Sequence, residues 1–281
     1  MEAQVRHEIV RFVHENPLNR FPDSNAPYFD EPLAGYAAAG DPLFSEYKTI
    51  IGAFHQTPQE VMARALGADT RAATVISWIL PITRPTRESN RVEEQYPSQA
   101  WTRTRFFGEQ LNAALRRHLV AWLRERGQQA IAPQLAESWQ EFADTPVGIA
   151  STWSERHAAY AAGLGTFSLN DALITPKGIA HRCGSVITDL RLAPSERPYP
   201  SHRHNCLYFR DGSCGLCIDR CPVGALSREG HDKPRCKQYV YQTIVAAVGE
   251  HFGTPQTGCG LCQTRVPCEG GIPGSARHDR T

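Results

Sequence analysis

Eight of the nine cysteines in this 281-residue chain lie in one stretch, from Cys206 to Cys268. The core of the stretch reads Cys-Gly-Leu-Cys-Ile-Asp-Arg-Cys-Pro and begins at Cys214. A Cys-x-x-Cys-x-x-x-Cys-Pro run is typical of the loop that binds [4Fe–4S] clusters in bacterial ferredoxins, where the last cysteine ligates a second cluster. The sequence therefore predicts two such clusters and a role in electron transfer.

The ligand sets of two-cluster ferredoxins cross over between the motifs, and this rule assigns the cysteines to two sets. One predicted set contains Cys221, Cys236, Cys259 and Cys262. The other contains Cys214, Cys217 and Cys268 and still needs a fourth ligand.

The fourth ligand of the second set is open to two interpretations. Ordinary ferredoxin spacing would place a cysteine where this chain has Asp211. Thiolate suits iron better than carboxylate does, which favours Cys206, five positions earlier. Ligation by Asp211 stays an alternative.

Other uses of paired cysteines fit the sequence less well. Paired Cys-x-x-Cys elements also form structural zinc sites, but the Cys-Pro ending has no role in tetrahedral zinc binding. Residues 1–8 are charged where a secretory signal would be apolar, which predicts a cytoplasmic protein. Disulfides are not expected in that reducing compartment.

The charge balance and the apolar stretches exclude two classes of partner. Thirty Lys and Arg against 29 Asp and Glu give a net charge of +1, so no basic field predicts a nucleic-acid partner. The longest apolar stretch, residues 72–82, is far shorter than the roughly 18 residues of a membrane span. We therefore expect no membrane partner.

Hydrophobic periodicity predicts a mixed α/β (α+β) fold, with helices alternating with strands in a sandwich. Helices are expected over residues 1–15, 58–66, 100–126 and 152–163, and strands over 74–80, 172–174 and 185–190. The last helix is expected to start with a capping box between Thr152 and Glu155. Residues 16–42 contain five prolines and several aromatic residues, which favours a long loop packed over the surface as a lid or binding element. Residues 1–200 and 201–281 are predicted as two domains.

Three segments ahead of the cysteine stretch carry a family resemblance. They are Ala-Gly-Leu-Gly-Thr-Phe at 162–167, Leu-Ile-Thr-Pro-Lys-Gly at 173–178 and Arg-Cys-Gly-Ser-Val-Ile-Thr-Asp-Leu at 182–190. Their order and their distance from the cysteines resemble the epoxyqueuosine reductase and reductive dehalogenase superfamily. The resemblance implies a nitroreductase-like domain that holds cobalamin, followed by a ferredoxin-like domain whose two [4Fe–4S] clusters relay electrons to the cobalt.

The chain also departs from this family. Epoxyqueuosine reductases carry an acidic proton donor shortly before the Gly-Leu-Gly segment, and the corresponding position here is Ile149, among residues without a carboxylate. The helical tail that helps those enzymes hold tRNA has no counterpart after Cys268. We therefore expect a cytoplasmic member with its own substrate, for which tRNA is not the expected partner.

The helix before the Gly-Leu-Gly segment supplies the candidate catalytic residues. Arg156, His157 and Tyr160 lie three or four positions apart, so they can share one helix face. Tyr160 or His157 is predicted to donate a proton, with the guanidinium of Arg156 lowering the pKa of the phenol. The alternative is an aromatic packing stripe that includes Trp153.

The resemblance also suggests residues that contact the cofactor. Glycines permit close approach of the backbone, and polar side chains nearby are candidates for hydrogen bonds to corrin amides, or alternatively cap turns. The candidate cofactor-binding residues are Gly163, Leu164, Gly165, Thr166, Ser168 and Thr175. Cys183, outside the cysteine stretch, is predicted to be a small buried residue.

The predicted function is that of an iron–sulfur oxidoreductase that passes electrons to cobalamin, for reductive chemistry on a small organic or modified-nucleoside substrate. Its expected electron donor is a reduced ferredoxin or a flavodoxin-type protein. One alternative is a non-catalytic electron carrier or activator that reduces a separate corrinoid protein or another redox partner. Another is a metal-stabilised binding module.

Overall fold

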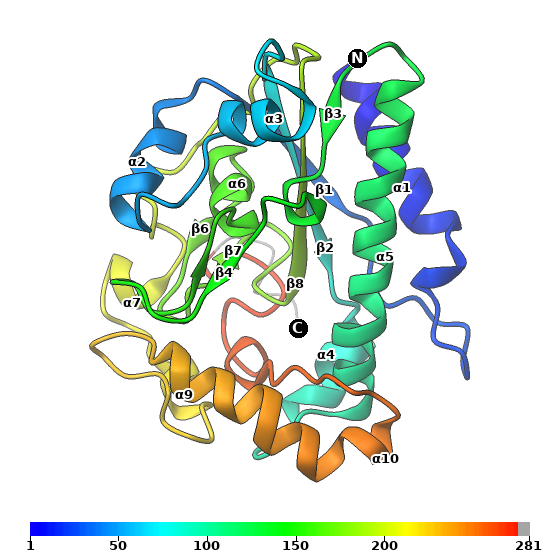
Figure 1. The fold of residues 1–281 in the computed structure, drawn as a ribbon. Helices are drawn as coiled ribbons and strands as arrows, with labels where there is room; N and C mark the ends of the chain where they lie inside the picture. The colour runs from blue at the N-terminus through cyan, green and yellow to red at the C-terminus, as the bar shows by residue number, and fades with distance from the viewer. Residues whose placement is uncertain (275–281) are drawn as a thin grey trace.

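The computed structural model describes residues 1–274 and is built around a four-stranded antiparallel sheet. Figure 1 shows the sheet standing between two groups of helices. Its order is β1 (Leu33–Ala38), β2 (Thr74–Pro81), β8 (His181–Thr188) and β3 (Ala130–Ile131). Two small hairpins pair β4 (Glu141–Phe142) with β5 (Ala150–Ser151), and β6 (Thr166–Phe167) with β7 (Leu173–Ile174).

Helices cover both faces of the sheet (Figure 1). One face packs against α1 (Glu2–Glu15) and α5 (Gln99–Arg124). The other carries α2 (Pro42–Ile50), α3 (Pro58–Leu66) and α6 (Glu155–Ala161), while α4 (Arg84–Arg91) lies at one end of α5. Short 3₁₀ turns occur at η1 (Pro17–Asn19) and η2 (Pro133–Leu135).

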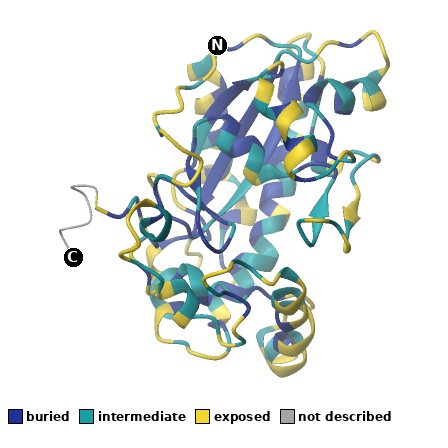
Figure 2. Cartoon of the chain, turned by 90° about the vertical axis from the view of Figure 1, so that its left-hand side faces the viewer, coloured by how far each residue is buried: buried dark blue, intermediate teal, exposed yellow. Residues whose placement is uncertain are grey.

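The cysteine-rich segment forms short helices joined by loops. They are α7 (Leu207–Arg210), α8 (Leu216–Asp219), α9 (Lys233–Gln238) and the 3₁₀ turn η5 (Leu261–Gln263). The chain continues from α9 through two π-helical stretches, η3 (Tyr239–Thr243) and η4 (Val245–Gly249), into α10 (Glu250–Phe252). Figure 2 shows burial concentrated in the sheet and exposure along this last helical run.

Strand β2 is the centre of the core because both of its faces are covered. All eight of its residues are buried. Side chains alternate between the faces of a strand, so Ile76 and Trp78 pack in the cluster with α1 and α5, while Val75 and Ile79 pack in the cluster with α6. The prediction of a central strand covered on both faces is confirmed.

The predicted helices at 1–15, 58–66 and 100–126 are confirmed to within two residues. The capping box predicted at Thr152 and Glu155 is wrong, because α6 begins later, after Ser154. The Thr152 hydroxyl instead accepts a hydrogen bond from the Gln140 amide at 3.1 Å. The Glu155 carboxylate is withdrawn into the core, where it accepts the Ser185 hydroxyl at 2.5 Å.

The lid-like loop predicted at residues 16–42 is also wrong in part. Strand β1 lies within it and pairs with β2 along six residues. Tyr28, Phe29 and Tyr36 are buried in the core rather than spread over the surface. The prolines flank β1 instead of preventing it, and the burial of the aromatic rings fixes the segment in place.

Polar contacts attach the cysteine-rich segment to α4 and to the loop before β8. The carboxylate of Glu269, next to Cys268, is 3% exposed and accepts a hydrogen bond from Arg91 of α4 at 2.8 Å. The Asn90 side chain donates to the Thr264 hydroxyl at 3.1 Å. The Cys268 carbonyl accepts the Ile179 amide at 2.9 Å. Across residues 1–274, every helix is too short or too polar to cross a membrane.

A Gly184→Ala variant should be less stable by about 1–3 kcal/mol, because overpacking a filled core forces neighbouring groups to shift. A Cβ at Gly184 would lie 2.5 Å from the Trp78 ring, which is fully buried and fixed by a hydrogen bond to Asn112 at 2.9 Å. Urea unfolding measures the change. Gly40→Ala is the matched control, since nothing lies within 4 Å of its Cβ position. Equal unfolding midpoints for the two variants would contradict this packing account.

Candidate redox site

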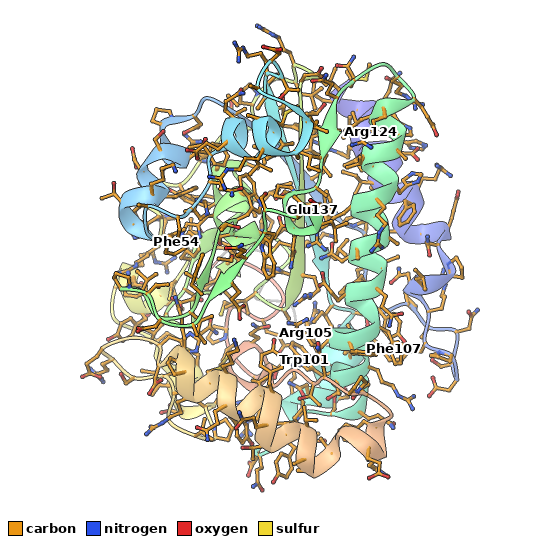
Figure 3. All side chains as sticks on the ribbon, viewed as in Figure 1. Phe54, Trp101, Arg105, Phe107, Arg124 and Glu137 are labelled. Atoms are coloured by element: carbon orange, nitrogen blue, oxygen red, sulfur yellow. The ribbon has the colours of Figure 1, made fainter. Side chains whose placement is uncertain are left out.

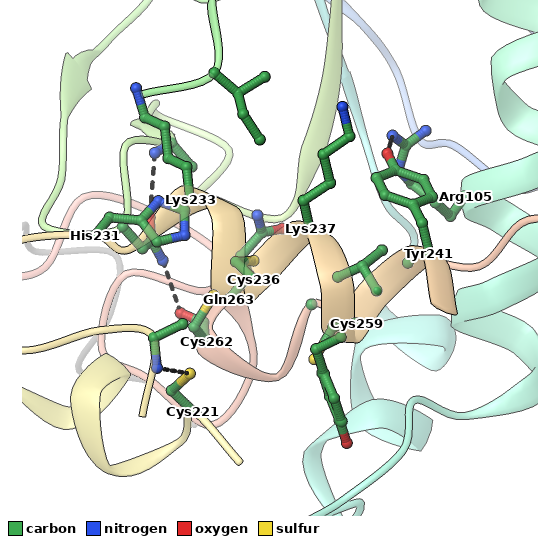
Figure 4. A pocket seen from close by; sticks show the side chains of 18 of the residues that line it. Arg105, Cys221, His231, Lys233, Cys236, Lys237, Tyr241, Cys259, Cys262 and Gln263 are labelled. Atoms are coloured by element: carbon green, nitrogen blue, oxygen red, sulfur yellow. Dashed lines mark hydrogen bonds between the residues drawn. The ribbon is translucent and has the colours of Figure 1, made fainter. Parts of the chain in front are cut away.

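The eight clustered cysteines fall into two groups that line two cavities. The inner group lines a cavity of about 720 Å³ between the sheet and α9, and consists of Cys221, Cys236, Cys259 and Cys262. Figure 4 shows these four residues around its wall. The outer group lines a small cavity of about 30 Å³ and consists of Cys206, Cys214, Cys217 and Cys268. The structure thus brings together the same sets that the sequence spacing grouped.

Each group supplies four thiols, the number of protein ligands that a [4Fe–4S] cluster takes. Within residues 1–274, no three His, Cys, Asp or Glu side chains converge on one ion position. Tetrahedral zinc needs four donors about 2–2.3 Å from one centre. The thiolates of a [4Fe–4S] cluster bind its separate iron corners and can therefore stand farther apart.

The burial of the thiols is also consistent with an iron–sulfur cluster as their ligand. Burial, with the neighbouring thiols, raises the pKa of Cys217 and of Cys259 to about 12. Thiolates at such positions require a compensating positive charge, which iron supplies, so metal binding and ionisation are coupled. The Ala225 amide also donates to the Cys221 sulfur at 3.2 Å, a contact that stabilises a thiolate.

The fourth member of the outer group is Cys206 rather than Asp211 in this geometry. Cys206 is 8% exposed and lines the same small cavity as its three partners. Asp211 is exposed and does not line that cavity. Its carboxylate accepts the Ser213 amide at 3.0 Å and pairs with Arg210 at 3.1 Å. The structure therefore favours the thiolate alternative.

Two glycines let the loop that carries Cys259 and Cys262 pack against α5. A Cβ at Gly260, where φ is +63°, would lie 2.0 Å from the Trp101 ring, and one at Gly258 would lie 2.5 Å from the Arg105 side chain. Trp101 and Arg105 lie on the same side of α5 in Figure 3, and Phe107 lies on the other. The close approach fixes Cys259 beside the large cavity.

The wall of the large cavity is rich in cations. Its lining includes Arg105, Arg156, Arg182, Lys233 and Lys237, against the carboxylates Glu109 and Glu141. These residues come from helices, strands and loops far apart in the sequence, so spacing alone could not find them.

Both carboxylates of this wall are already paired. Although burial favours the neutral acid, Arg182 and Arg116 lower the pKa of Glu109 to about 2. Arg116 donates to Glu109 at 2.8 Å, and Arg182 pairs with the same carboxylate. Glu141 pairs with Lys237 at 2.6 Å. The remaining cations of the wall therefore face the cavity without a lining carboxylate as partner.

The three predicted catalytic residues lie at a second cavity of about 600 Å³. Arg156, His157 and Tyr160 all line it. Arg156 and Lys233 also line the large cavity, so the two spaces adjoin. The predicted common face of this helix is therefore present.

The electrostatics of these residues differ from the sequence expectation. Burial, opposed by Arg197, raises the pKa of Tyr160 above its usual value, and the predicted lowering by Arg156 is wrong. Arg156 donates instead to the Asp171 carbonyl at 2.6 Å. Burial lowers the pKa of His157 to about 3, so its imidazole is neutral near neutral pH.

The glycines expected to approach a cofactor approach the protein backbone instead. A Cβ at Gly163 would lie 2.2 Å from the Glu196 carbonyl oxygen, and one at Gly165 would lie 2.5 Å from that of Ile174. Leu164 is buried in the core cluster of α6. These three residues serve chain packing.

The hydroxyl groups expected at the cofactor also have partners within the protein. Thr166 accepts the Asn205 amide at 2.9 Å, and Thr175 donates to the Gly178 carbonyl at 2.9 Å. Ser168 donates to the Ala172 carbonyl at 2.9 Å and borders the second cavity. The turn-capping alternative describes these contacts, and none of the three lines the large cavity.

Cys183 lies on β8, outside both cysteine groups, and is partly buried against the core rather than fully buried as predicted. Burial raises the pKa of its thiol to about 11.

Comparisons with known proteins agree with this arrangement. No family model matches the chain. Epoxyqueuosine reductase of Bacillus anthracis is 31% identical over 124 residues, which cover 42% of this chain and 30% of that protein. The Bacillus subtilis (strain 168) enzyme of the same name is 32% identical over 123 residues, with the same shares. These matches span less than a third of the relatives' length.

Solved structures extend the likeness to nearly the whole chain. A selenomethionine-labelled epoxyqueuosine reductase superposes with a TM-score of 0.54 at 18% identity, covering 95% of this chain and 66% of that one. A reductive dehalogenase with a proposed mechanism for B12-dependent dehalogenation gives a TM-score of 0.56 at 17% identity, with 87% and 31% covered. The chain is thus similar in sequence to epoxyqueuosine reductases over 42% of its length. Its mixed α/β fold resembles that of epoxyqueuosine reductase and of the reductive dehalogenase.

A Cys206→Ser variant, purified without oxygen and reconstituted, should lose about four iron atoms and about four sulfides per chain, because the outer cluster would lack a ligand. Asp211→Asn should keep the full content, since its carboxylate serves the local turn. Iron and sulfide analysis of the two variants decides whether Cys206 or Asp211 is the fourth ligand of the outer group. The reverse result would assign Asp211 as the ligand.

The stability of the folded protein should depend on pH through His157. The pKa of His157 in the folded protein lies below its ordinary value of about 6.5, so the unfolded chain binds more protons at acidic pH. The free energy of unfolding should therefore fall as the pH drops from about 6.5 towards about 3. His157→Gln should lessen that loss in urea unfolding at several pH values. His7→Gln, at an exposed position of α1, should leave it unchanged. Parallel losses in wild type and His157→Gln would contradict the burial argument.

Proposed function

We propose that this protein is an iron–sulfur oxidoreductase in which two [4Fe–4S] clusters relay electrons to cobalamin. Its domains would be a nitroreductase-like sandwich and a ferredoxin-like domain. The observation that carries the proposal is that the inner cysteine group and several cationic side chains line one cavity. A cofactor seated there would lie beside a cluster. Cobalamin would supply low-valent cobalt for reductive chemistry on a small organic or modified-nucleoside substrate.

The outer group is the proposed entry point for electrons. Leu216 stands between Cys214 and Cys217 and is 46% exposed, so the outer group lies near the surface. A reduced ferredoxin or flavodoxin-type protein is the proposed donor. The inner group then passes electrons from the outer group into the large cavity.

His181, in the wall of the large cavity, has a ring nitrogen that can accept a hydrogen bond from an amide-rich cofactor such as a corrin. The Nε2 atom of His181 donates to the Leu173 carbonyl at 3.0 Å, which leaves Nδ1 as an acceptor. Nδ1 is buried and has no partner among residues 1–274. Burial lowers the pKa of His181 to about 4, so the ring stays neutral and can accept an amide N–H.

Tyr160 is the proposed proton donor of the second cavity. Its phenol is protonated at neutral pH, as a general acid requires, and burial raises its pKa further above the ordinary value. His157 is neutral and packs between Tyr47 and Phe167, with both ring centroids 4.7 Å away, so its role is to shape the wall. Arg156, where the two cavities adjoin, is proposed to orient the substrate.

The substrate is proposed to be small. One of the solved structures with a similar fold is an epoxyqueuosine reductase with an epoxyqueuosine-modified tRNA stem loop. The second cavity, of about 600 Å³, is of the size that receives single small molecules. A small organic compound or a modified nucleoside is therefore proposed in preference to tRNA.

Anaerobically purified protein should be brown, contain about eight iron atoms and about eight sulfides per chain, and bind cobalamin. The Co(II) electron paramagnetic resonance spectrum should change on binding, with loss of the lower axial nitrogen ligand. Free cobalamin in the same buffer is the control. Intact clusters with an unchanged cobalt spectrum would refute the reductase proposal and favour the electron-carrier alternative.

A further inference from the structure

Arg105 is one of the cations in the wall of the large cavity that make no ion pair within residues 1–274. Arg105 of α5 makes one hydrogen bond, to the Tyr241 hydroxyl at 3.4 Å (Figure 4). No carboxylate of residues 1–274 lies within ion-pair distance of its guanidinium. By contrast, Arg182 of the same wall is paired with Glu109.

The surroundings of Arg105 disfavour its charge, although the side chain is only half-buried. Burial and the nearby charge of Arg182 lower the pKa of Arg105 to about 10, which still leaves it protonated at neutral pH. A guanidinium offers five N–H donors in a planar fork, and one weak contact leaves most of them without an acceptor inside the protein. Such a fork matches the two oxygens of a carboxylate or phosphate.

We propose that Arg105 and Tyr241 form an oxyanion site, which binds a carboxylate or phosphate group of the ligand in the large cavity. The inference rests on the proposed function, in which this cavity receives cofactor and substrate. Arg105 supplies the bidentate contact, and the Tyr241 hydroxyl, on the helical run after α9, supplies another donor. Two separate parts of the chain thus meet at the bound group.

The position of the site places the bound group beside the inner cysteine group. Arg105 passes so close to Gly258 that a Cβ there would lie 2.5 Å from its side chain, and Gly258 directly precedes Cys259. The rival account is that Arg105 only offsets the negative charge of a four-thiolate cluster. That account predicts a change in the reduction potential of the cluster and no change in ligand binding.

The test compares Arg105→Gln with Arg103→Gln in the full chain carrying its clusters. Arg103 lies on the same helix but pairs with Asp23 at 2.8 Å, so it is a matched control outside the cavity. Cobalamin is titrated first. Benzoate and inorganic phosphate are then titrated by calorimetry with and without cobalamin, and benzamide serves as the neutral counterpart of benzoate.

Loss of a charged hydrogen-bonding group should weaken binding by about tenfold or more. If the oxyanion belongs to the cofactor, Arg105→Gln weakens cobalamin binding. If it belongs to the substrate, Arg105→Gln leaves cobalamin binding intact and weakens benzoate or phosphate binding, and Arg105→Lys restores part of it. Arg103→Gln changes neither.

Unchanged affinities in Arg105→Gln, or a shift confined to the cluster's reduction potential, would overturn the proposal. Equal binding of benzoate and benzamide by wild type without cobalamin would overturn it too. If wild type binds no cobalamin, the proposed cofactor is wrong, whereas the anion titrations still decide the oxyanion site. The two failures are therefore distinguishable.

Discussion

The buried carboxylate of Glu269 joins the cysteine-rich segment to the rest of the molecule. It accepts hydrogen bonds from Arg91 at 2.8 Å and from the Arg265 amide at 2.8 Å, and Arg87 lies 3.4 Å away. Removing one partner from a buried ion pair leaves an uncompensated charge, which is strongly destabilising. Because Glu269 follows Cys268 directly, this contact sets where the outer cysteine group stands relative to the sheet.

The large cavity lies where α5, the start of β8 and the loop that carries Cys259 and Cys262 come together. Arg116 of α5 pairs with Glu109 of the same helix and with Glu155 of α6, which joins the two helices. Arg182 joins β8 to this network by pairing with Glu109. The loop that carries Cys259 and Cys262 packs against Trp101 of α5. The cations in the wall of this cavity suit an anionic ligand and a negatively charged cluster alike. A redox cofactor would thus meet both.

The sequence could predict what depends on local pattern. Strand β2 reads as a continuous apolar run and is buried throughout, and the cysteine spacing gives two groups that the fold does bring together. It could not predict contacts that depend on tertiary packing. Gly163 and Gly165 meet neighbouring carbonyls rather than a cofactor, and Arg105 was missed because its cavity forms only when α5 meets the segment near Cys259.

The central claim is that the eight cysteines hold two [4Fe–4S] clusters, one of them facing the large cavity. Mössbauer spectroscopy of protein reconstituted without oxygen, using isotopically enriched iron, tests this claim most directly. The account predicts that about eight iron atoms per chain appear as two cubane clusters, both reducible by dithionite. Protein that takes up zinc without sulfide, or that holds only one cluster with all cysteines intact, would contradict it.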